Sequence, residues 1–306
     1  MKKTGLIVAM LFSAAMLFAQ TTAQEYLSRY ALLVNKLGVD GLGIETLIKK
    51  WEADFPDDVD MLCAKYNYYS VKSQRSEVVQ KDQDKYLGAK PILSLKDSTG
   101  KDVHYFTETF FDDDLYGIAT QALEKAIRLR DDDISLRLTR ITSLLAYEKD
   151  SPDMATQALR SLVDYNCTAH PAWKYGTEDP YTEEQFLAAM SDYCYYLFRM
   201  ASPVGFESFK SLSEKLLSYY PKNTDFLNNV GSYYLVARKD YKTAIKYYGK
   251  TLKLDPANYA AIKNCVLAAR KTGNAKLEKK YLQMLVRVSP DEREKQSAQA
   301  RLDAMK

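Results

Sequence analysis

A proline that follows successive helical patterns constrains the fold of this chain more than any other feature. Leu-Asp-Pro at 254–256 and Val-Ser-Pro at 288–290 both close helical patterns, and their prolines are 34 residues apart. Tyr-Tyr-Pro at 219–221 ends 35 residues before the first of these, and Asp-Phe-Pro at 54–56 ends an earlier helix in the same way. A helix, turn, helix, proline unit that recurs at this period is typical of a helical solenoid.

The composition agrees with a helical, folded chain. With 46% hydrophobic residues the chain can bury a core, which excludes a disordered or collagen-like protein. Only 12 Gly and 9 Pro among 306 residues disfavour a large β-sandwich. Lys and Arg exceed Asp and Glu by 43 − 40 = 3, or by 41 − 40 = 1 once Lys2 and Lys3 are removed. We therefore expect no nucleic-acid partner and no binding to an anionic membrane surface.

The first residues have the pattern of a secretory signal peptide. A basic start at 1–3 precedes an apolar stretch over 5–18 that is short for a membrane span. We predict a signal peptide over residues 1–23, with cleavage after Ala19 or Ala23, and an uncleaved membrane anchor is the alternative. No later segment approaches a membrane-spanning length, so we expect no integral membrane segment after cleavage. The predicted location is the periplasm of a Gram-negative-type bacterium.

One unit carries a recognisable motif. From 227 to 258 the large, small and proline positions are Leu227, Val230, Gly231, Tyr234, Ala244, Tyr248 and Pro256. This spacing resembles the tetratricopeptide repeat (TPR). Small residues at 231 and 244 let the two helices of a unit approach closely, while the large residues fill the space around that contact. The next unit, 259–290, is a degenerate copy, because Glu278 stands where a small residue is expected.

The expected fold is all-α: a right-handed α-solenoid of about six TPR-like helix pairs over residues 24–306. Helix starts at 151–152, 182–185 and 289–292 have capping residues that support this segmentation. A polar tail with one apolar stripe, over 291–306, predicts a C-terminal capping helix. The six expected pairs span 24–56, 59–130 with an insertion, 134–165, 182–221, 224–257 and 258–290.

Two segments interrupt the helical period. Residues 88–114 contain two strand-like runs around a turn and predict a small β-hairpin insertion. Its aromatic residues, Tyr105 and Phe106 among them, either dock a partner or are simply buried. Residues 166–181 predict a long loop with Trp173 and Tyr175, which is either a binding loop or an insert packed on the helices.

The motifs of common enzymes are missing from the sequence. The two histidines, His104 and His170, lie in different insertions without a nucleophile motif beside them. The glycines of 38–43 lack the lysine and the strand context of a phosphate-binding loop. The acidic triplets 112–114 and 131–133 each precede a helix, where capping is favoured over cation binding. We expect no enzyme, no cofactor and no metal.

The cysteines allow two interpretations. An oxidising compartment would permit disulfides, and four cysteines give three full pairings between which the sequence does not choose. Small buried thiols are the simpler interpretation, since two of the four lie inside helical apolar patterns. The four are Cys63, Cys167, Cys194 and Cys265.

The resemblance to TPR proteins implies a scaffold that binds a partner protein or an extended peptide in its concave groove. The pattern of the last two units places Asn228, Asn229, Ser232, Lys263, Asn264 and Arg270 along that groove. Only Asn264 matches the family's carboxylate clamp, so no clamp is predicted. Two other functions stay open: a structural subunit of an envelope assembly or secretion complex, and a small-molecule or glycan-binding protein that uses Trp173, Tyr175 and the hairpin aromatics.

Overall fold

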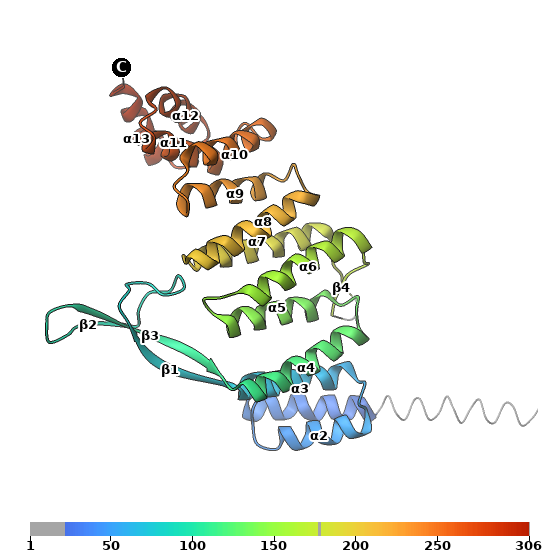
Figure 1. Cartoon of the computed structure of the whole chain (residues 1–306). Helices are drawn as coiled ribbons and strands as arrows, with labels where there is room; N and C mark the ends of the chain where they lie inside the picture. The colour runs from blue at the N-terminus through green and yellow to red at the C-terminus, as the bar shows by residue number, and fades with distance from the viewer. Residues whose placement is uncertain (1–21, 177–178, 306) are drawn as a thin grey trace, which may run out of the picture. The chain divides into compact units, whose positions relative to one another are not determined.

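The computed structural model describes residues 22–176 and 179–305 (Figure 1). The predicted signal peptide therefore lies almost wholly outside the described residues. The described chain divides into two compact units. The first comprises residues 22–84, 90–143, 172–176 and 179–181, and the second comprises residues 85–89, 144–171 and 182–305.

Helix pairs form most of the first unit. A helix over residues 22–37 is followed by α2 (Ile44–Asp54), α3 (Val59–Lys72) and α4 (Asp113–Leu129), and α5 (Ile134–Glu148) begins here and ends in the second unit. Helix α3 packs against both α2 and α4. The fully buried Trp51 lies in their shared core and donates its indole N–H to Asp58 at 2.9 Å. Asp58 also caps α3, so one carboxylate fixes both the helix start and the core tryptophan.

A three-stranded antiparallel sheet separates α3 from α4. Its strands are β1 (Gln74–Lys81), β2 (Leu93–Lys96) and β3 (Asp102–Phe111), in the order β1-β3-β2. The expected hairpin is present as β2 and β3, but the insertion begins earlier than residue 88 and has an additional strand. Strand β1 gave no alternating apolar signal because its two valines are adjacent and most of its side chains are exposed. In Figure 1 the sheet extends away from the ends of α3 and α4.

The second unit is a succession of antiparallel helices. They are α6 (Asp153–Ala169), α7 (Glu183–Arg199), α8 (Pro203–Tyr219), α9 (Thr224–Val236), α10 (Tyr241–Leu254), α11 (Tyr259–Lys271), α12 (Ala275–Val288) and α13 (Glu292–Asp303). From α7 onward each helix packs against the next one along the chain. The predicted fold class, an all-α repeat of helix pairs with a small β insertion and a terminal capping helix, is confirmed.

The segment 166–181 is more ordered than a long loop. Helix α6 continues to Ala169 and ends where His170 adopts a left-handed conformation before Pro171, so Cys167 is helical. The remainder contains the two-residue strands β4 (Lys174–Tyr175) and β5 (Asp179–Pro180), which pair with each other. The loop prediction was therefore wrong for residues 166–169, which continue α6 because Pro171, the proline that follows the helix, lies later than the predicted start of the loop.

The acidic triplets act as caps, as predicted. Asp112 accepts a hydrogen bond from the Leu115 amide at the start of α4. Asp133 accepts hydrogen bonds from the amide and hydroxyl of Ser135 at the start of α5, and from the Gly176 amide at 3.0 Å. This buried carboxylate thus also ties the short β4–β5 segment to the first unit.

All four cysteines are free thiols in the described chain. Burial raises the pKa of Cys63 to about 11 and the pKa values of Cys194 and Cys265 to about 12. Thiols with such pKa values are poor nucleophiles at neutral pH. The thiol interpretation, and not the disulfide one, describes this structure: Cys194 and Cys265 are buried, and Cys63 and Cys167 are half-buried.

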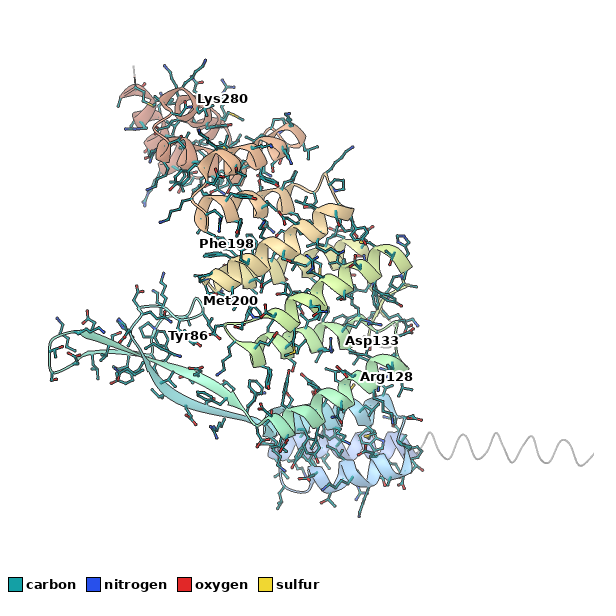
Figure 2. The ribbon with its side chains drawn as sticks, viewed as in Figure 1. Tyr86, Arg128, Asp133, Phe198, Met200 and Lys280 are labelled. Atoms are coloured by element: carbon teal, nitrogen blue, oxygen red, sulfur yellow. The ribbon has the colours of Figure 1, made fainter. Side chains whose placement is uncertain are left out.

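A short segment of the insertion belongs to the second unit. Residues 85–89 lie against the end of α7, where Figure 2 labels Tyr86 and Met200. Gly88 has φ +77°, and a Cβ at this position would overlap the carbonyl oxygen of Arg199. Glycine is therefore required here both by the backbone conformation and by the close approach.

Candidate partner-binding site

The unit that matches the repeat motif best also contains a very tight helix contact. A Cβ on Gly231 of α9 would lie 2.7 Å from Cε1 of Tyr248 on α10, so the tyrosine ring packs directly on the glycine. Tyr248 and Ala244 are fully buried. The Tyr248 hydroxyl lies 3.1 Å from the hydroxyl of Ser232, which gives this buried polar atom a partner. The positions that the motif assigns to the close helix contact of this unit are thus the positions that make the contact in the structure.

Three of the predicted groove residues are engaged in contacts between helices. Asn228 donates from Nδ2 to Oδ1 of Asn258 at 3.0 Å, and its own Oδ1 is buried. Asn229 interacts with the buried thiol of Cys194 and opposes the rise of its pKa, and Ser232 pairs with Tyr248. All three are half-buried, and the contacts of Asn228 and Asn229 join neighbouring repeats.

The other three predicted groove residues line one cavity. It has a volume of about 530 Å³ and lies among α11, α12 and α13, with Lys263, Asn264 and Arg270 in its wall. Its apolar lining comes from Val266, Leu267, Leu282, Leu285 and Ala298, and its remaining polar lining from Glu294, Ser297 and Arg301. Sequence reasoning missed the contribution of α13, because that helix had been interpreted only as a cap.

A buried carboxylate organises one side of this cavity. Glu278 is 4% exposed and accepts hydrogen bonds from Nε of Arg270 at 3.0 Å and from Nε of Arg301 at 3.1 Å. The Arg301 guanidinium, followed by that of Arg270, lowers the pKa of Glu278, although burial opposes the shift. This pairing explains why a glutamate can occupy the position where a small residue was expected: it links α11, α12 and α13.

A second ion pair lies on the opposite side of the cavity. Lys263 lies 2.9 Å from Glu294 and donates to the hydroxyl of Tyr259 at 3.1 Å. Burial alone would raise the pKa of Glu294, but hydrogen bonds from Ser289 and Lys263 outweigh it, and the pKa is lowered. The cavity wall therefore holds three cationic side chains and one anionic side chain around an apolar floor, and the buried Glu278 lies behind two of the cations.

The predicted aromatic residues of the insertion have different surroundings. Phe106 is buried at 3% exposure and Tyr105 is half-buried, both on β3. The exposed apolar side chains of the insertion lie instead on β1 and on or just before β2. They are Val78, Ile92, Leu93 and Leu95.

The predicted residues of segment 166–181 also differ from each other. Trp173 is 5% exposed, and the guanidinium of Arg137 lies 5.4 Å from the centre of its ring. Tyr175 is 55% exposed and stacks on Tyr181 at a ring-centre distance of 5.9 Å. The tryptophan is thus part of the interior of the first unit, whereas the tyrosine is on its surface.

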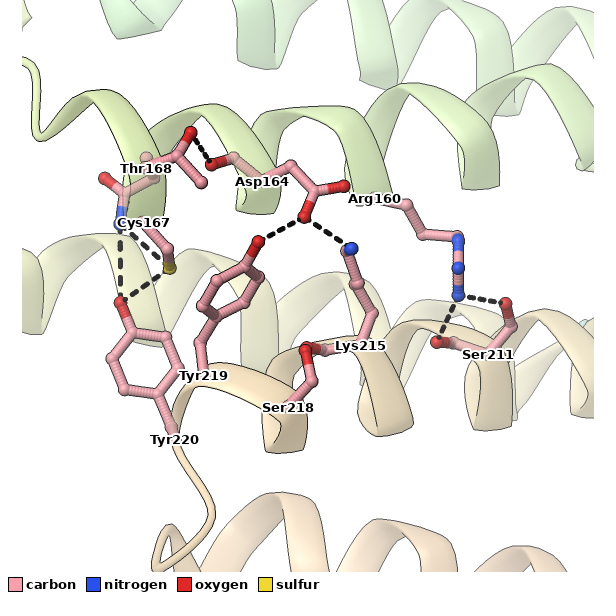
Figure 3. A network of polar contacts seen from close by, with 10 residues as sticks. Arg160, Asp164, Cys167, Thr168, Ser211, Lys215, Ser218, Tyr219 and Tyr220 are labelled. Atoms are coloured by element: carbon pink, nitrogen blue, oxygen red, sulfur yellow. Dashed lines mark hydrogen bonds and ion pairs between the residues drawn. The ribbon is translucent and has the colours of Figure 1, made fainter.

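A polar network joins α6 and α8 in the second unit (Figure 3). Asp164 accepts hydrogen bonds from the Tyr219 hydroxyl and from Lys215, and the Lys215 ammonium lowers the pKa of Asp164. The Tyr220 hydroxyl donates to Glu183 at 2.9 Å and lies 3.4 Å from the sulfur of Cys167. These side chains satisfy one another, and Cys167 contributes to packing between helices.

The described residues bring together few groups with catalytic potential. Nδ1 of His104 lies 2.8 Å from the hydroxyl of Ser94 across exposed strands of the sheet, and His170 is exposed in the other unit. Within residues 22–176 and 179–305 no cluster of three or more metal-binding side chains occurs. Over the same ranges no helix has the length and apolarity needed to cross a membrane.

Comparisons with known proteins give matches of fold only. No protein-family model and no curated protein matches the chain. Similar solved structures include PilF of Pseudomonas aeruginosa, with 12% identity over 92% of this chain and 99% of that chain and a TM-score of 0.36. The P58(IPK) TPR domain has 12% identity over 93% and 64% of the two chains and a TM-score of 0.32. The flexible tandem repeat domain of a bacterial cellulose synthase component has 15% identity over 92% and 96%, with a TM-score of 0.28.

Proposed function

We propose that this chain is a non-catalytic TPR-like scaffold that binds an extended segment of a partner protein at the cavity formed by α11, α12 and α13. The observation that carries the proposal is the composition of this cavity. Its volume of about 530 Å³ is typical of binding pockets, and it combines an apolar floor with a few charged groups. Three residues that the repeat pattern assigned to the groove contribute to it.

The geometry suggests how a segment would bind. Leu267 is 43% exposed beside the buried Leu282 and Leu285, so an apolar side chain of the partner can pack there. Arg270 donates to Glu278 through Nε, and Arg301 donates through Nε and Nη2; both remain about half exposed, so their other terminal N–H groups can donate to backbone carbonyls or carboxylates. Ordered arginine side chains lose less entropy on binding than free ones would.

Photo-crosslinking at two matched leucines tests this site. A photoreactive amino acid replaces Leu267 in one variant and Leu254, on α10 outside the cavity, in the other; the two side chains are 43% and 45% exposed. We expect a discrete adduct in intact cells from position 267 and none from position 254. Equal labelling at both positions, or none at 267, would contradict the proposal.

We further propose that the protein is exported to the periplasm, on the basis of the basic and apolar pattern of residues 1–23. An alkaline phosphatase fusion after Gln24 tests this, because that enzyme is active only after export. An inactive fusion retained in the cytoplasm would refute the location. The alternative of a permanent member of an envelope assembly is distinguished by purification, since such a protein would co-purify with its partner in fixed ratio.

A further inference from the structure

The terminal helix α13 is attached to the second unit by very little apolar surface. Of its twelve residues, Glu292–Asp303, the buried ones are Ala298 and Leu302. The neighbouring α12 buries three large apolar side chains, Tyr281, Leu282 and Leu285. Since local stability follows buried apolar contact, α13 is expected to open before the rest of the unit.

The specificity of the α13 contact comes from two ion pairs. Arg301 binds the buried Glu278 of α12, and Glu294 binds Lys263 of α11 and the hydroxyl of Ser289. When α13 leaves, Glu278 loses one of its two guanidinium partners while it remains beside apolar side chains. An exposed docking face with an underpaired carboxylate favours rebinding of a helix with the same charge pattern.

The connection between α12 and α13 suits an exchange between chains. Residues 289–291 form a three-residue linker, which can span at most about 10 Å when extended. Ser289 already has an extended backbone, φ −60° and ψ 131°, as the following proline requires. Pro290 also prevents α12 and α13 from fusing into one helix, so both remain separate helices after opening.

We propose that α13 exchanges between two copies of this chain, so that each α13 docks on α11 and α12 of the other copy. The face of α11 and α12 that one α13 leaves is thus occupied by α13 of the second copy, because the charges and the apolar stripe of that helix fit this face. The short linker requires the two copies to meet end to end at their C-terminal helices. This inference does not rest on the proposed function, although in the exchanged dimer the cavity is lined by residues from both chains.

Charge reversal at one ion pair tests the exchange. Glu278→Arg in one chain and Arg301→Glu in another each place like charges at the closed contact. In a mixed dimer the arginine introduced on α12 of one chain meets the glutamate introduced on α13 of the other. With Arg270 nearby, the cluster again contains two guanidinium groups and one carboxylate.

We expect the equimolar mixture of the two full-length variants to form a species of twice the chain mass by light scattering. Its fraction should exceed that of wild type at the same concentration by about tenfold or more.

Two further measurements keep the test decisive. The double variant Glu278→Arg/Arg301→Glu restores the pair within one chain and should behave as wild type. Circular dichroism shows whether the first pair of variants is folded. If it is not, Lys263→Glu and Glu294→Lys are mixed in the same way, because this ion pair is less buried, and the mixture should give the same dimer. If neither mixture of folded variants gains a species of twice the mass, the proposal is overturned.

Discussion

Replacing Gly231 with alanine is expected to destabilise the α9–α10 pair, whereas the same change at Gly249 is expected to stabilise it. Both glycines lie inside helices, so both replacements gain about 1 kcal/mol of helix propensity. At Gly231 the new Cβ lies 2.7 Å from one carbon and 2.9 Å from another carbon of the Tyr248 ring. That ring is fully buried, so it cannot move aside freely. At Gly249 nothing lies within 4 Å of the new Cβ.

The difference between the two variants isolates the cost of overpacking. Such overpacking costs about 1 to 3 kcal/mol, so Gly231→Ala should lose about 0 to 2 kcal/mol net and Gly249→Ala should gain about 1 kcal/mol. Urea unfolding followed by circular dichroism gives the two free energies, and hydrogen exchange of α9 and α10 localises the change. If both variants are stabilised equally, the close contact at Gly231 does not exist and the repeat register is wrong.

Three other perturbations have defined outcomes. Ala244→Leu overpacks a fully buried position and should cost about 1 to 3 kcal/mol, whereas Lys242→Leu on the exposed side should cost less than about 0.5 kcal/mol in the same urea assay. Hydrogen bonds from Lys49 and Lys72 lower the pKa of Glu45 to about 2. The stabilisation by the ionised Glu45 is therefore full above pH 4.5 and is lost as the pH falls toward 2. Hydrogen exchange should show this loss of stability in α2 and α3, and Glu45→Gln should remove it. Gly88→Ala, at φ +77°, should release residues 85–89 from the end of α7 and make them the first site of limited proteolysis, while wild type resists cleavage there.

The helix pairs were predictable because their signals are local. Proline after a helix, a capping side chain before it and a small residue at each close contact act within one unit, and Gly231 with Tyr248 shows that this register is correct. Strand β1 gave no such signal, since its stability comes from pairing with β3, where Gln74 lies opposite Phe111. Pairing partners so far apart in the chain are not encoded in the periodicity of one segment.

The candidate site was predictable only in part for a related reason. A repeat pattern indicates which face of a helix a residue occupies, but not which neighbour fills the space in front of it. Lys263 and Arg270 line a cavity because α13 leaves space in front of α11, while Asn228 faces Asn258 of the next repeat. Trp173 is buried, with the guanidinium of Arg137 from α5 over its ring, and the pattern of its own segment does not indicate that partner.

The side-chain amide of Asn258 couples the unfolding of two neighbouring repeats. Its oxygen caps α11 through the Ala261 amide and also accepts from Asn228 of α9, while its nitrogen donates to Asp255. Fraying at the start of α11 therefore breaks a contact of the preceding repeat, which makes the two repeats one cooperative unit.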